Sequence, residues 1–432
     1  MVMRPTVALI FAVAGCASAS PVVAPRPEPL PVVQLQIDVP NAVLENLAGG
    51  KFDALARLFD PESDPPTAEQ IARVWRDKSL GMGKVVHWHV GGRTFQDGFE
   101  TRIATLELEY GELQCLLSIV PESQLVASLF ITEPAPPARY VDRSRFREVA
   151  LSVGAGSFVL PATLTLPVGG GPFPGVVLVH GSGPNDRDET VGANKIFKDL
   201  AEGLATAGIA VLRYDKRTYA AAGSLSNDAL TLDTEVVDDA VDAVRTLAER
   251  RDIAPGQVYV IGHSLGAMLA PEIAVRSGVM AAGVVLIAPP GRAPWDIIRE
   301  QMRYLRAPRE VRANLEQTLV RMSLGGNEGT IMGLPATYWR DWANRDGIAM
   351  ARQLRRVLVL HGDRDYQVTA EDFAIWRRGL AGVRGAELVS LPGDNHLLIR
   401  GTGQPTPLEY KVPGHLDERA FARILAWLRR FP

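Results

Sequence analysis

From residue 146 to the C-terminus, apolar residues follow two alternating spacings. Short continuous apolar runs predict buried strands, and an apolar residue at every third or fourth position predicts a helix. Helical spacing is clearest at 232–250, and another helix is expected at about 194–207. An early strand hairpin followed by repeated strand–helix units predicts a mostly parallel sheet with helices on both faces. The runs expected to form strands are residues 146–153, 158–166, 176–180, 209–214, 258–261, 284–288, 357–360 and 388–391.

The preceding part of the chain, residues 41–133, has a different order of patterns. Helical spacings at 43–59 and 71–75 predict two helices, and the strand-like runs that follow predict an antiparallel sheet. This order indicates a separate small α+β domain. A Pro-rich stretch at 134–139 marks the linker to the second domain, which is expected at 140–432. The expected strands of the small domain are residues 85–90, 99–109, 113–120 and 125–131.

The first 40 residues have the pattern of an export signal followed by a tether. The apolar run at 7–14 follows a positive flank and is too short to span a bilayer as a helix. The sequence Val-Ala-Gly-Cys that ends at Cys16 resembles the lipobox of bacterial lipoproteins, which implies a signal at residues 1–16 and a lipid on Cys16. The Pro-rich residues 17–40 then form an extended tether to the membrane. The alternative is a plain secretory peptide cleaved near residues 17–19, which gives a soluble periplasmic protein, and both interpretations place the chain in the bacterial cell envelope.

The charged residues, cysteines and histidines of the chain indicate whether it can bind nucleic acid, form a disulfide or hold a metal ion. The 46 basic and 49 acidic residues are well mixed and give a net charge of −3, so no basic stripe is available for nucleic acid. If Cys16 carries lipid, Cys115 is the one cysteine left, which excludes an intrachain disulfide and favours a buried thiol. His87 and His89 share one face of a strand, which is a spacing that a metal can use. No third ligand is evident, so a half-exposed strand face is the favoured interpretation.

The strongest local signal for chemistry is Gly-His-Ser-Leu-Gly at 262–266. A buried strand is expected directly before it and a helix directly after it, which is the strand–turn–helix context of a nucleophile elbow. Such a turn exposes the Ser264 hydroxyl at a helix N-terminus, where unpaired amides favour developing negative charge. Ser264 is therefore the predicted nucleophile, and the alternative is a serine in an ordinary Gly-rich turn.

A serine nucleophile needs a base, and the base needs an acid that orients it. The strand expected at 357–360 ends in the polar turn His-Gly-Asp-Arg-Asp, where Asp365 is the predicted acid and Asp363 the alternative. His396 follows the last expected strand and is the predicted general base, with a structural loop histidine as the alternative. This order of serine, acid and histidine is that of α/β-hydrolases. We expect activity to fall where acid protonates His396.

The reaction also needs two amide donors for the oxyanion. The first is the amide of Leu265, which follows the nucleophile. The loop after the strand at 176–180 supplies the second, and its Gly-Ser-Gly sequence makes the amide of Ser182 the candidate. The polar residues 185–189 that follow either touch substrate or tie loops together through ion pairs.

Together these motifs resemble bacterial α/β-hydrolase serine esterases of the dienelactone-hydrolase-like group, from about residue 140 to the C-terminus. The resemblance implies the α/β-hydrolase fold and hydrolysis of carboxylic esters through an acyl-enzyme, with no cofactor. Dienelactone hydrolase itself uses a cysteine nucleophile, so its substrate is not implied here. Residues 41–133 resemble the small nuclear-transport-factor-like domain that precedes some bacterial α/β-hydrolases. The segments that carry the main resemblance are 180–189, 194–195, 213–218, 262–266, 361–365 and the His396 loop.

A long insertion at about 290–356 has helical spacing and many aromatic residues. It is expected to form a cap over the strand ends and is a candidate for the acyl pocket, although its aromatic residues can equally pack the cap onto the body of the domain. The same triad also serves thioesterases, peptidases and acyltransferases. A function of a different class is a non-catalytic envelope-binding protein that works through the small domain. The complete set of Ser264, Asp365 and His396 disfavours it.

Overall fold

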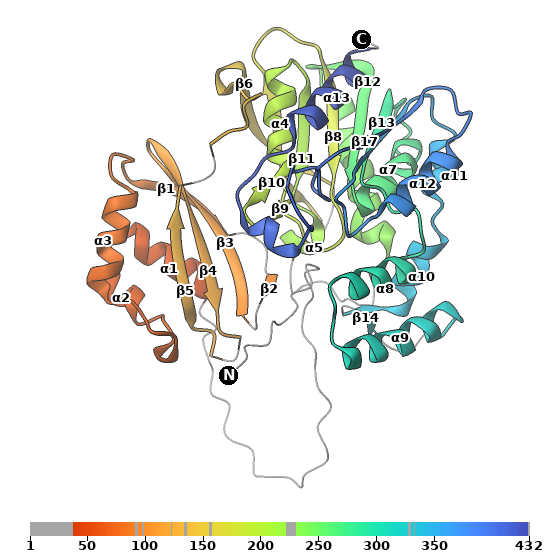
Figure 1. Cartoon of the computed structure of the whole chain (residues 1–432). Coiled ribbons are helices and arrows are strands. Elements are labelled where there is room, and N and C mark those ends of the chain that lie inside the picture. The colour runs from red at the N-terminus through yellow and green to blue at the C-terminus, as the bar shows by residue number, and fades with distance from the viewer. Residues whose placement is uncertain are drawn as a thin grey trace. The chain divides into compact units, whose positions relative to one another are not determined.

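The computed structural model describes residues 38–90, 94–96, 99–121, 123–133, 136–154, 158–221, 230–326, 330–331 and 333–430, with the backbone alone described at 94–96. The chain divides into two units, residues 1–134 and 135–432, and each is described by itself (Figure 1). The predicted signal with Cys16 and the tether up to residue 37 lie outside the described residues. Within the described ranges, no helix is both long enough and apolar enough to cross a membrane.

The first unit packs helices against an antiparallel sheet in which the strands pair in the order β1-β3-β4-β5, with β2 beside β3. Alternate residues of β4, such as Leu113, Cys115 and Leu117, are fully buried in the core that the helices and the sheet share. Burial raises the pKa of the Cys115 thiol to about 12. The elements are α1 (Val39–Ala48), α2 (Phe52–Ala56), η1 (Pro61–Ser63), α3 (Ala68–Lys78), β1 (Val85–Val90), β2 (Thr94–Gln96), β3 (Phe99–Leu108), β4 (Gly111–Ile119) and β5 (Val126–Thr132).

Two helix boundaries in this unit differ from the prediction. Helix α1 begins inside the predicted tether because the Asp38 carboxylate caps it, accepting from the Asn41 amide at 3.3 Å. Pro40 is tolerated there, since the first turn of a helix does not need its N–H. The apolar spacing at 43–59 continues across a break at Gly50, which adopts a φ of 66°, so this stretch forms α1 and α2 rather than one helix.

The second unit is built on an eight-stranded sheet with the order β17-β16-β13-β12-β8-β11-β7-β6. β6 and β7 form an antiparallel hairpin, β7 pairs antiparallel with β11, and the other neighbours are parallel. The central strands are buried along their length because both faces are covered. The predicted fold class is therefore confirmed. The strands are β6 (Phe146–Val153), β7 (Leu160–Pro167), β8 (Phe173–Val179), β11 (Ala210–Tyr214), β12 (Ile253–His263), β13 (Gly283–Ile287), β16 (Val357–Gly362) and β17 (Ala386–Leu391).

Helices cover both faces of this sheet (Figure 1). Helix α4 packs beside α13, whose Trp427 contacts the ring of Tyr259 on β12, and α6 packs beside α7 on the opposite face. The helix predicted at 232–250 begins as a π-helical turn, η4, and continues as α6. These elements are α4 (Ile196–Thr206), α5 (Arg217–Ala220), η4 (Asp233–Val237), α6 (Asp238–Ala248), α7 (Leu265–Arg276), α12 (Ala370–Gly379) and α13 (Glu418–Arg429), with short segments η2 (Arg143–Arg145), β9 (Thr190–Val191), β10 (Asn194–Lys195) and η5 (Pro407–Lys411).

The insertion between β13 and β16 is helical, and its elements α8, α9, α10 and β14 lie together at the lower right of Figure 1. The rings of Trp339 and Trp342 stack with their centroids 5.8 Å apart, and Tyr338 meets Trp339 edge to face at 5.3 Å. All three side chains are buried. They pack against one another, and the Tyr338 hydroxyl donates to Glu235 of η4, so this cluster joins the cap to the body of the unit. The elements are α8 (Pro294–Tyr304), α9 (Arg309–Ser323), β14 (Thr330–Ile331), β15 (Leu334–Pro335), α10 (Ala336–Asn344) and α11 (Gly347–Ala351).

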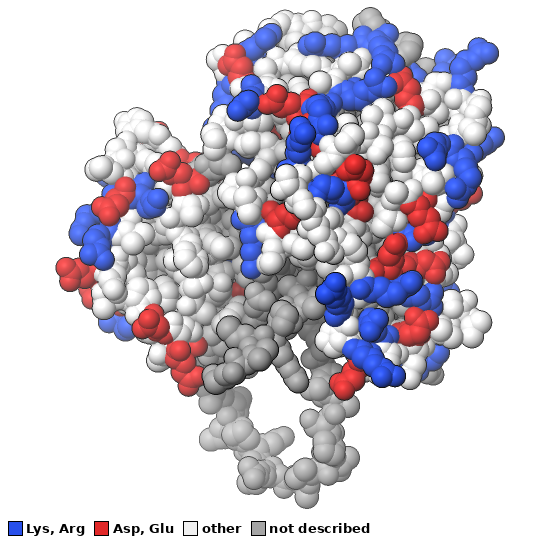
Figure 2. Space-filling view, viewed as in Figure 1, with Lys and Arg blue, Asp and Glu red and all other residues white. Residues whose placement is uncertain are grey.

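Charged residues of both signs are interspersed on the face of the second unit that Figure 2 shows. Ion pairs between charged residues of this unit include Arg423 with Glu387, whose atoms lie 2.9 Å apart. The visible face therefore presents no extended basic surface of the kind that neutralises phosphates.

Candidate active site

Ser264 lies in a sharp turn between the end of β12 and the start of α7. Its φ of 53° and ψ of −121° belong to a region that side-chain-bearing residues rarely adopt, and its amide donates to the Ile287 carbonyl at 2.8 Å. A Cβ at Gly262 would lie 2.3 Å from the carbonyl oxygen of Gly266, and one at Gly266 would lie 2.3 Å from the carbonyl oxygen of His180. Both glycines of the motif are thus required by close backbone packing, and the turn has the geometry of a nucleophile elbow.

The predicted base and acid are in direct contact. His396 Nδ1 lies 2.6 Å from Asp365 Oδ2, and both side chains are buried. Asp365 Oδ1 accepts from the amides of Gln367 at 2.8 Å and Val368 at 2.9 Å, which fixes the carboxylate. Because a carboxylate only accepts hydrogen bonds, Nδ1 carries the proton and Nε2 keeps its lone pair. The ring is therefore in the tautomer that a general base requires.

The alternative acid, Asp363, does not reach the histidine. Its side chain is exposed, and its Oδ1 accepts from the Gly393 amide at 2.7 Å. Of the two carboxylates in the turn after β16, the one that contacts His396 is Asp365.

The loop after β8 approaches the nucleophile closely. A Cβ at Gly181 would lie 3.2 Å from the Cβ of Ser264. The Gly181 amide is occupied, since it donates to Glu189 Oε1 at 2.7 Å. Among the described residues, no oxygen accepts from the Ser182 amide, and Leu265 is the first residue of α7, where amides have no partner within the helix. Neither amide thus has an acceptor among the described residues, which leaves both able to donate to an oxyanion.

A second buried histidine and carboxylate lie next to the nucleophile: His263 directly precedes Ser264 in the chain, and Glu189 contacts His263. His263 Nδ1 lies 3.0 Å from Glu189 Oε1, and its Nε2 lies 3.0 Å from the carbonyl oxygen of His396. Because a carbonyl oxygen only accepts, Nε2 must carry a proton, and a further proton must lie between Nδ1 and the carboxylate. Since Glu189 also holds the Gly181 amide, this pair joins the loop after β8, the elbow and the His396 loop.

Electrostatics place the further proton of this pair on His263. Burial alone lowers the pKa of His263, but the Glu189 carboxylate outweighs burial and raises the pKa above its usual value. For Glu189, burial alone raises the pKa, but the charge and hydrogen bond of His263 outweigh burial and lower it. Both shifts favour the charged form of the pair, an imidazolium beside a carboxylate.

We expect Glu189→Gln to destabilise the protein most on the acidic side of the raised His263 pKa. The stability that His263 gains from Glu189 is complete below its unfolded pKa of about 6.5 and is lost as pH rises through the higher folded pKa. The melting temperature of wild type should therefore exceed that of Glu189→Gln at pH 6.5, by the equivalent of about 2 kcal/mol. Thermal melts at increasing pH should show this difference shrinking, and a difference that is constant or grows with pH would contradict the assignment.

The polar loop at 185–189 is engaged in ion pairs within the second unit. Arg187 makes two parallel hydrogen bonds to Asp215, with Nε–Oδ1 at 2.9 Å and Nη2–Oδ2 at 2.7 Å. Asp188 contacts Arg213 of β11. These contacts favour the interpretation that the loop ties structural elements together.

Sequence reasoning did not single out His263 and Glu189 as partners, although both lie within the motifs on which the resemblance rests.

Metal-binding side chains do not gather in the part of the chain that the structure describes. No group of three or more His, Cys, Asp or Glu residues there is arranged to hold an ion. His87 and His89 lie exposed on β1, opposite Glu107 and Thr105 of β3.

Comparison with known proteins gives matches over most of the chain. The family described as the alpha/beta hydrolase family matches residues 176–406, more than half of the chain and a span that includes Ser264, Asp365 and His396. Esterase EstD from Thermotoga maritima is 42% identical over 374 residues, which cover 84% of this chain and 87% of that protein. The second unit is shorter than this match, so the similarity extends into the first unit.

Solved structures that are similar include Est1E from Butyrivibrio proteoclasticus, with a TM-score of 0.42, 16% identity and coverage of 65% of this chain and 96% of that chain. The Pyrococcus furiosus esterase Pf2001 has a TM-score of 0.43 and 16% identity, over 69% of this chain and 98% of that chain. The match to the family over more than half of the chain, and the 42% identity to a relative of similar length, decide the assignment. This protein belongs to the alpha/beta hydrolase family.

Proposed function

We propose that the protein is a serine carboxylesterase that hydrolyses carboxylic esters through an acyl-enzyme on Ser264. The observation that carries this proposal is the buried contact between His396 Nδ1 and Asp365 Oδ2. His263, which directly precedes Ser264, donates from Nε2 to the His396 carbonyl oxygen and so holds the His396 loop against the nucleophile elbow. The rings of His263 and His396 lie 4.7 Å apart. A relative named as an esterase, 42% identical over most of both chains, supports esters as the substrate class.

Each residue of the site has a defined part in the proposed reaction. His396 Nε2 takes the proton of Ser264 as Oγ attacks the acyl carbon, and Asp365 stabilises the imidazolium that forms. The amides of Leu265 and Ser182 bind the oxyanion. His396 then returns the proton to the leaving alcohol, which departs from the acyl-enzyme. A water molecule that loses its proton to His396 attacks next, and the acid is released with Ser264 restored.

The test compares leaving groups on one acyl group and locates the nucleophile. The full chain is assayed with matched butyryl substrates, a p-nitrophenyl ester, a thioester and a p-nitroanilide, and is labelled separately with a fluorophosphonate. We expect turnover fastest on the ester and a single label on the peptide that contains Ser264. If Ser264 is labelled but the thioester or the anilide is turned over faster than the ester, the protein is a thioesterase or an amidase that uses the same triad, and the carboxylesterase proposal is wrong. No turnover and no label would contradict the catalytic proposal and favour a binding role.

A further inference from the structure

Lys216 is a buried ammonium group directly beside the loop that carries Ser182. Its side chain is 2% exposed, and its Nζ donates to the carbonyl oxygens of Gly181 at 2.8 Å and Gly183 at 3.0 Å. The third donor of Nζ goes to Glu235 Oε1. A lysine has three such donors, so every one is used within the protein. Burying an ammonium group is costly unless it is paired in this way.

These contacts help to direct the Ser182 amide, together with Asn185 Nδ2, which donates to the same two carbonyl oxygens at 3.2 Å. In a trans peptide the carbonyl and the following N–H are directed to opposite sides. Because Lys216 holds the Gly181 carbonyl, the Ser182 N–H is directed away from Lys216. The Gly183 carbonyl is held by the same ammonium group, so the loop is fixed on both sides of Ser182. The Gly181 amide is held independently by Glu189.

Glu235 links this lysine to the cap. Its second oxygen, Oε2, accepts from the hydroxyl of Tyr338 on α10, and both side chains are buried. Burial, together with the negative charge of Glu235, raises the pKa of Tyr338, so the phenol keeps the proton that it donates. A continuous chain of hydrogen bonds therefore runs from the cap helix α10 through Tyr338, Glu235 and Lys216 to the carbonyls on either side of Ser182.

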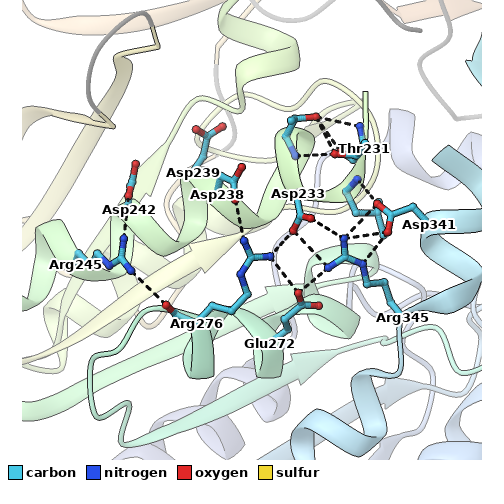
Figure 3. A network of polar contacts seen from close by, with 12 residues as sticks. Thr231, Asp233, Asp238, Asp239, Asp242, Arg245, Glu272, Arg276, Asp341 and Arg345 are labelled. Carbon is cyan, nitrogen blue, oxygen red and sulfur yellow. Dashed lines mark hydrogen bonds and ion pairs between the residues drawn. The ribbon is translucent and has the colours of Figure 1, made fainter. Parts of the chain in front are cut away.

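Helix η4, which carries Glu235, and the residues just before it are tied to the α10 region by a second set of contacts, shown in Figure 3. Arg345 reaches Asp233 Oδ2 at 3.0 Å and Glu272 Oε1 at 2.6 Å, and Arg276 converges on the same two carboxylates. Asp341 of α10 accepts from the Leu232 amide at 2.9 Å. Helix α10 and the residues that lead into η4 are thus joined at several points, and a displacement of α10 displaces Glu235.

We propose that Lys216 is a positioning residue for the oxyanion hole, and that Glu235 and Tyr338 make its geometry depend on the placement of cap helix α10. This inference rests on the proposed function, in which the Ser182 amide binds the oxyanion. The cap then affects kcat as well as substrate binding, because an oxyanion donor acts in the transition state rather than in the ground state.

The first test is Tyr338→Phe, with Tyr304→Phe as the matched control. Tyr304 is a half-buried tyrosine of the cap, in α8, and its hydroxyl donates to the Pro405 carbonyl at 2.8 Å, so it takes no part in the hydrogen-bond chain to Lys216. For Tyr338→Phe we expect kcat to fall about 5- to 20-fold, with KM changed less than about twofold. This loss is smaller than the loss caused by removing an oxyanion donor completely, because the Ser182 amide is misplaced rather than absent. For Tyr304→Phe we expect both constants within about twofold of wild type.

A transition-state analogue separates positioning from a general structural effect. A trifluoromethyl ketone of matched acyl chain adds to Ser264 Oγ, which gives a hemiketal oxyanion in the same hole. Its Ki for Tyr338→Phe should rise by the same factor as kcat/KM falls. Unchanged kcat in this variant, or a lower kcat with unchanged Ki, would overturn the inference.

The second test removes both buried charges together as Lys216→Met with Glu235→Gln. Removal of the lysine alone leaves Glu235 buried and unpaired, which destabilises the fold. We expect kcat of the double variant to fall about 10- to 100-fold, with the Ki of the ketone rising in proportion. A folded double variant with wild-type kcat would overturn the role of Lys216. Wild-type turnover and labelling of Ser264 by fluorophosphonate test the proposed function separately, so failure of the two proposals is distinguishable.

Discussion

Replacing Ser264 with alanine is expected to lower kcat for ester hydrolysis by about 10⁴- to 10⁶-fold and to abolish labelling by fluorophosphonate. The acyl-enzyme cannot form without Oγ, and His396 has no hydroxyl to deprotonate. The measurement is initial-rate hydrolysis of p-nitrophenyl butyrate, with enzyme concentrations high enough to resolve the residual rate. Retention of more than about a hundredth of wild-type kcat would place the nucleophile elsewhere.

A companion variant, Ser264→Gly, shows whether this loss is chemical rather than structural. Alanine keeps the side-chain strain of a φ of 53°, so we expect Ser264→Ala to melt near the wild-type temperature. Glycine adopts this φ freely, so Ser264→Gly should be more stable than Ser264→Ala by about 1 kcal/mol and equally inactive. An alanine variant that melts far below wild type would mean that its inactivity reports misfolding.

The nucleophile elbow could be predicted because its requirements are local. The glycines at 262 and 266 are needed where backbone segments approach within 2.3 Å of a would-be Cβ, and the flanking apolar runs define the strand and the helix. The positions of acid and base along the chain were predicted from the order of triad residues in α/β-hydrolases together with the strands that precede Asp365 and His396. Distinguishing Asp365 from Asp363 required knowledge of how one turn is folded. The two side chains lie on the same turn, but Asp363 accepts from the Gly393 amide while Asp365 contacts His396.

The polar contacts that organise the site could not be predicted, since their partners meet through tertiary folding. Glu189 and His263 are 74 positions apart, and Glu235 and Tyr338 are 103 positions apart. No spacing along the sequence connects such residues, and a buried lysine has the same local pattern as an exposed one. The sequence of 232–250 likewise predicted helix but not the π-helical turn at Asp233–Val237, because apolar periodicity does not distinguish the two hydrogen-bond patterns.

Strand boundaries were predicted better than helix boundaries. Most strand ends in both units agree with the predicted runs to within two residues. The exceptions are β8 and β12, which begin three and five residues before the predicted apolar runs because each strand includes proline and glycine positions that the apolar pattern omits. In the first unit, glycine and proline residues decided the outcome, as the break at Gly50 and the start of α1 at Val39 show. Both are effects of backbone conformation, which an apolar pattern does not record.

Asp365→Asn is expected to lower kcat by about 10³- to 10⁴-fold, while Asp363→Asn stays within about threefold of wild type. The amides of Gln367 and Val368 hold the oxygen of the residue at 365, so an asparagine there keeps its carbonyl oxygen toward them and turns its NH₂ group to His396. An NH₂ donor forces Nδ1 to accept, which moves the ring proton to Nε2 and removes the lone pair that takes the Ser264 proton. An asparagine at 363 still accepts from the Gly393 amide, so that variant is a matched control for the change of charge in this turn.

The two variants are compared by kcat on p-nitrophenyl butyrate at pH 8, with thermal melts to show that both are folded. The loss in Asp365→Asn should lie in kcat rather than in KM, because the acid acts on the base and not on the bound ester. A larger loss in Asp363→Asn than in Asp365→Asn would mean that the turn after β16 rearranges in the working enzyme and that the alternative carboxylate orients His396. Equal and small losses in both would show that His396 is oriented by its loop, through the bond from His263 to its carbonyl oxygen, more than by either carboxylate.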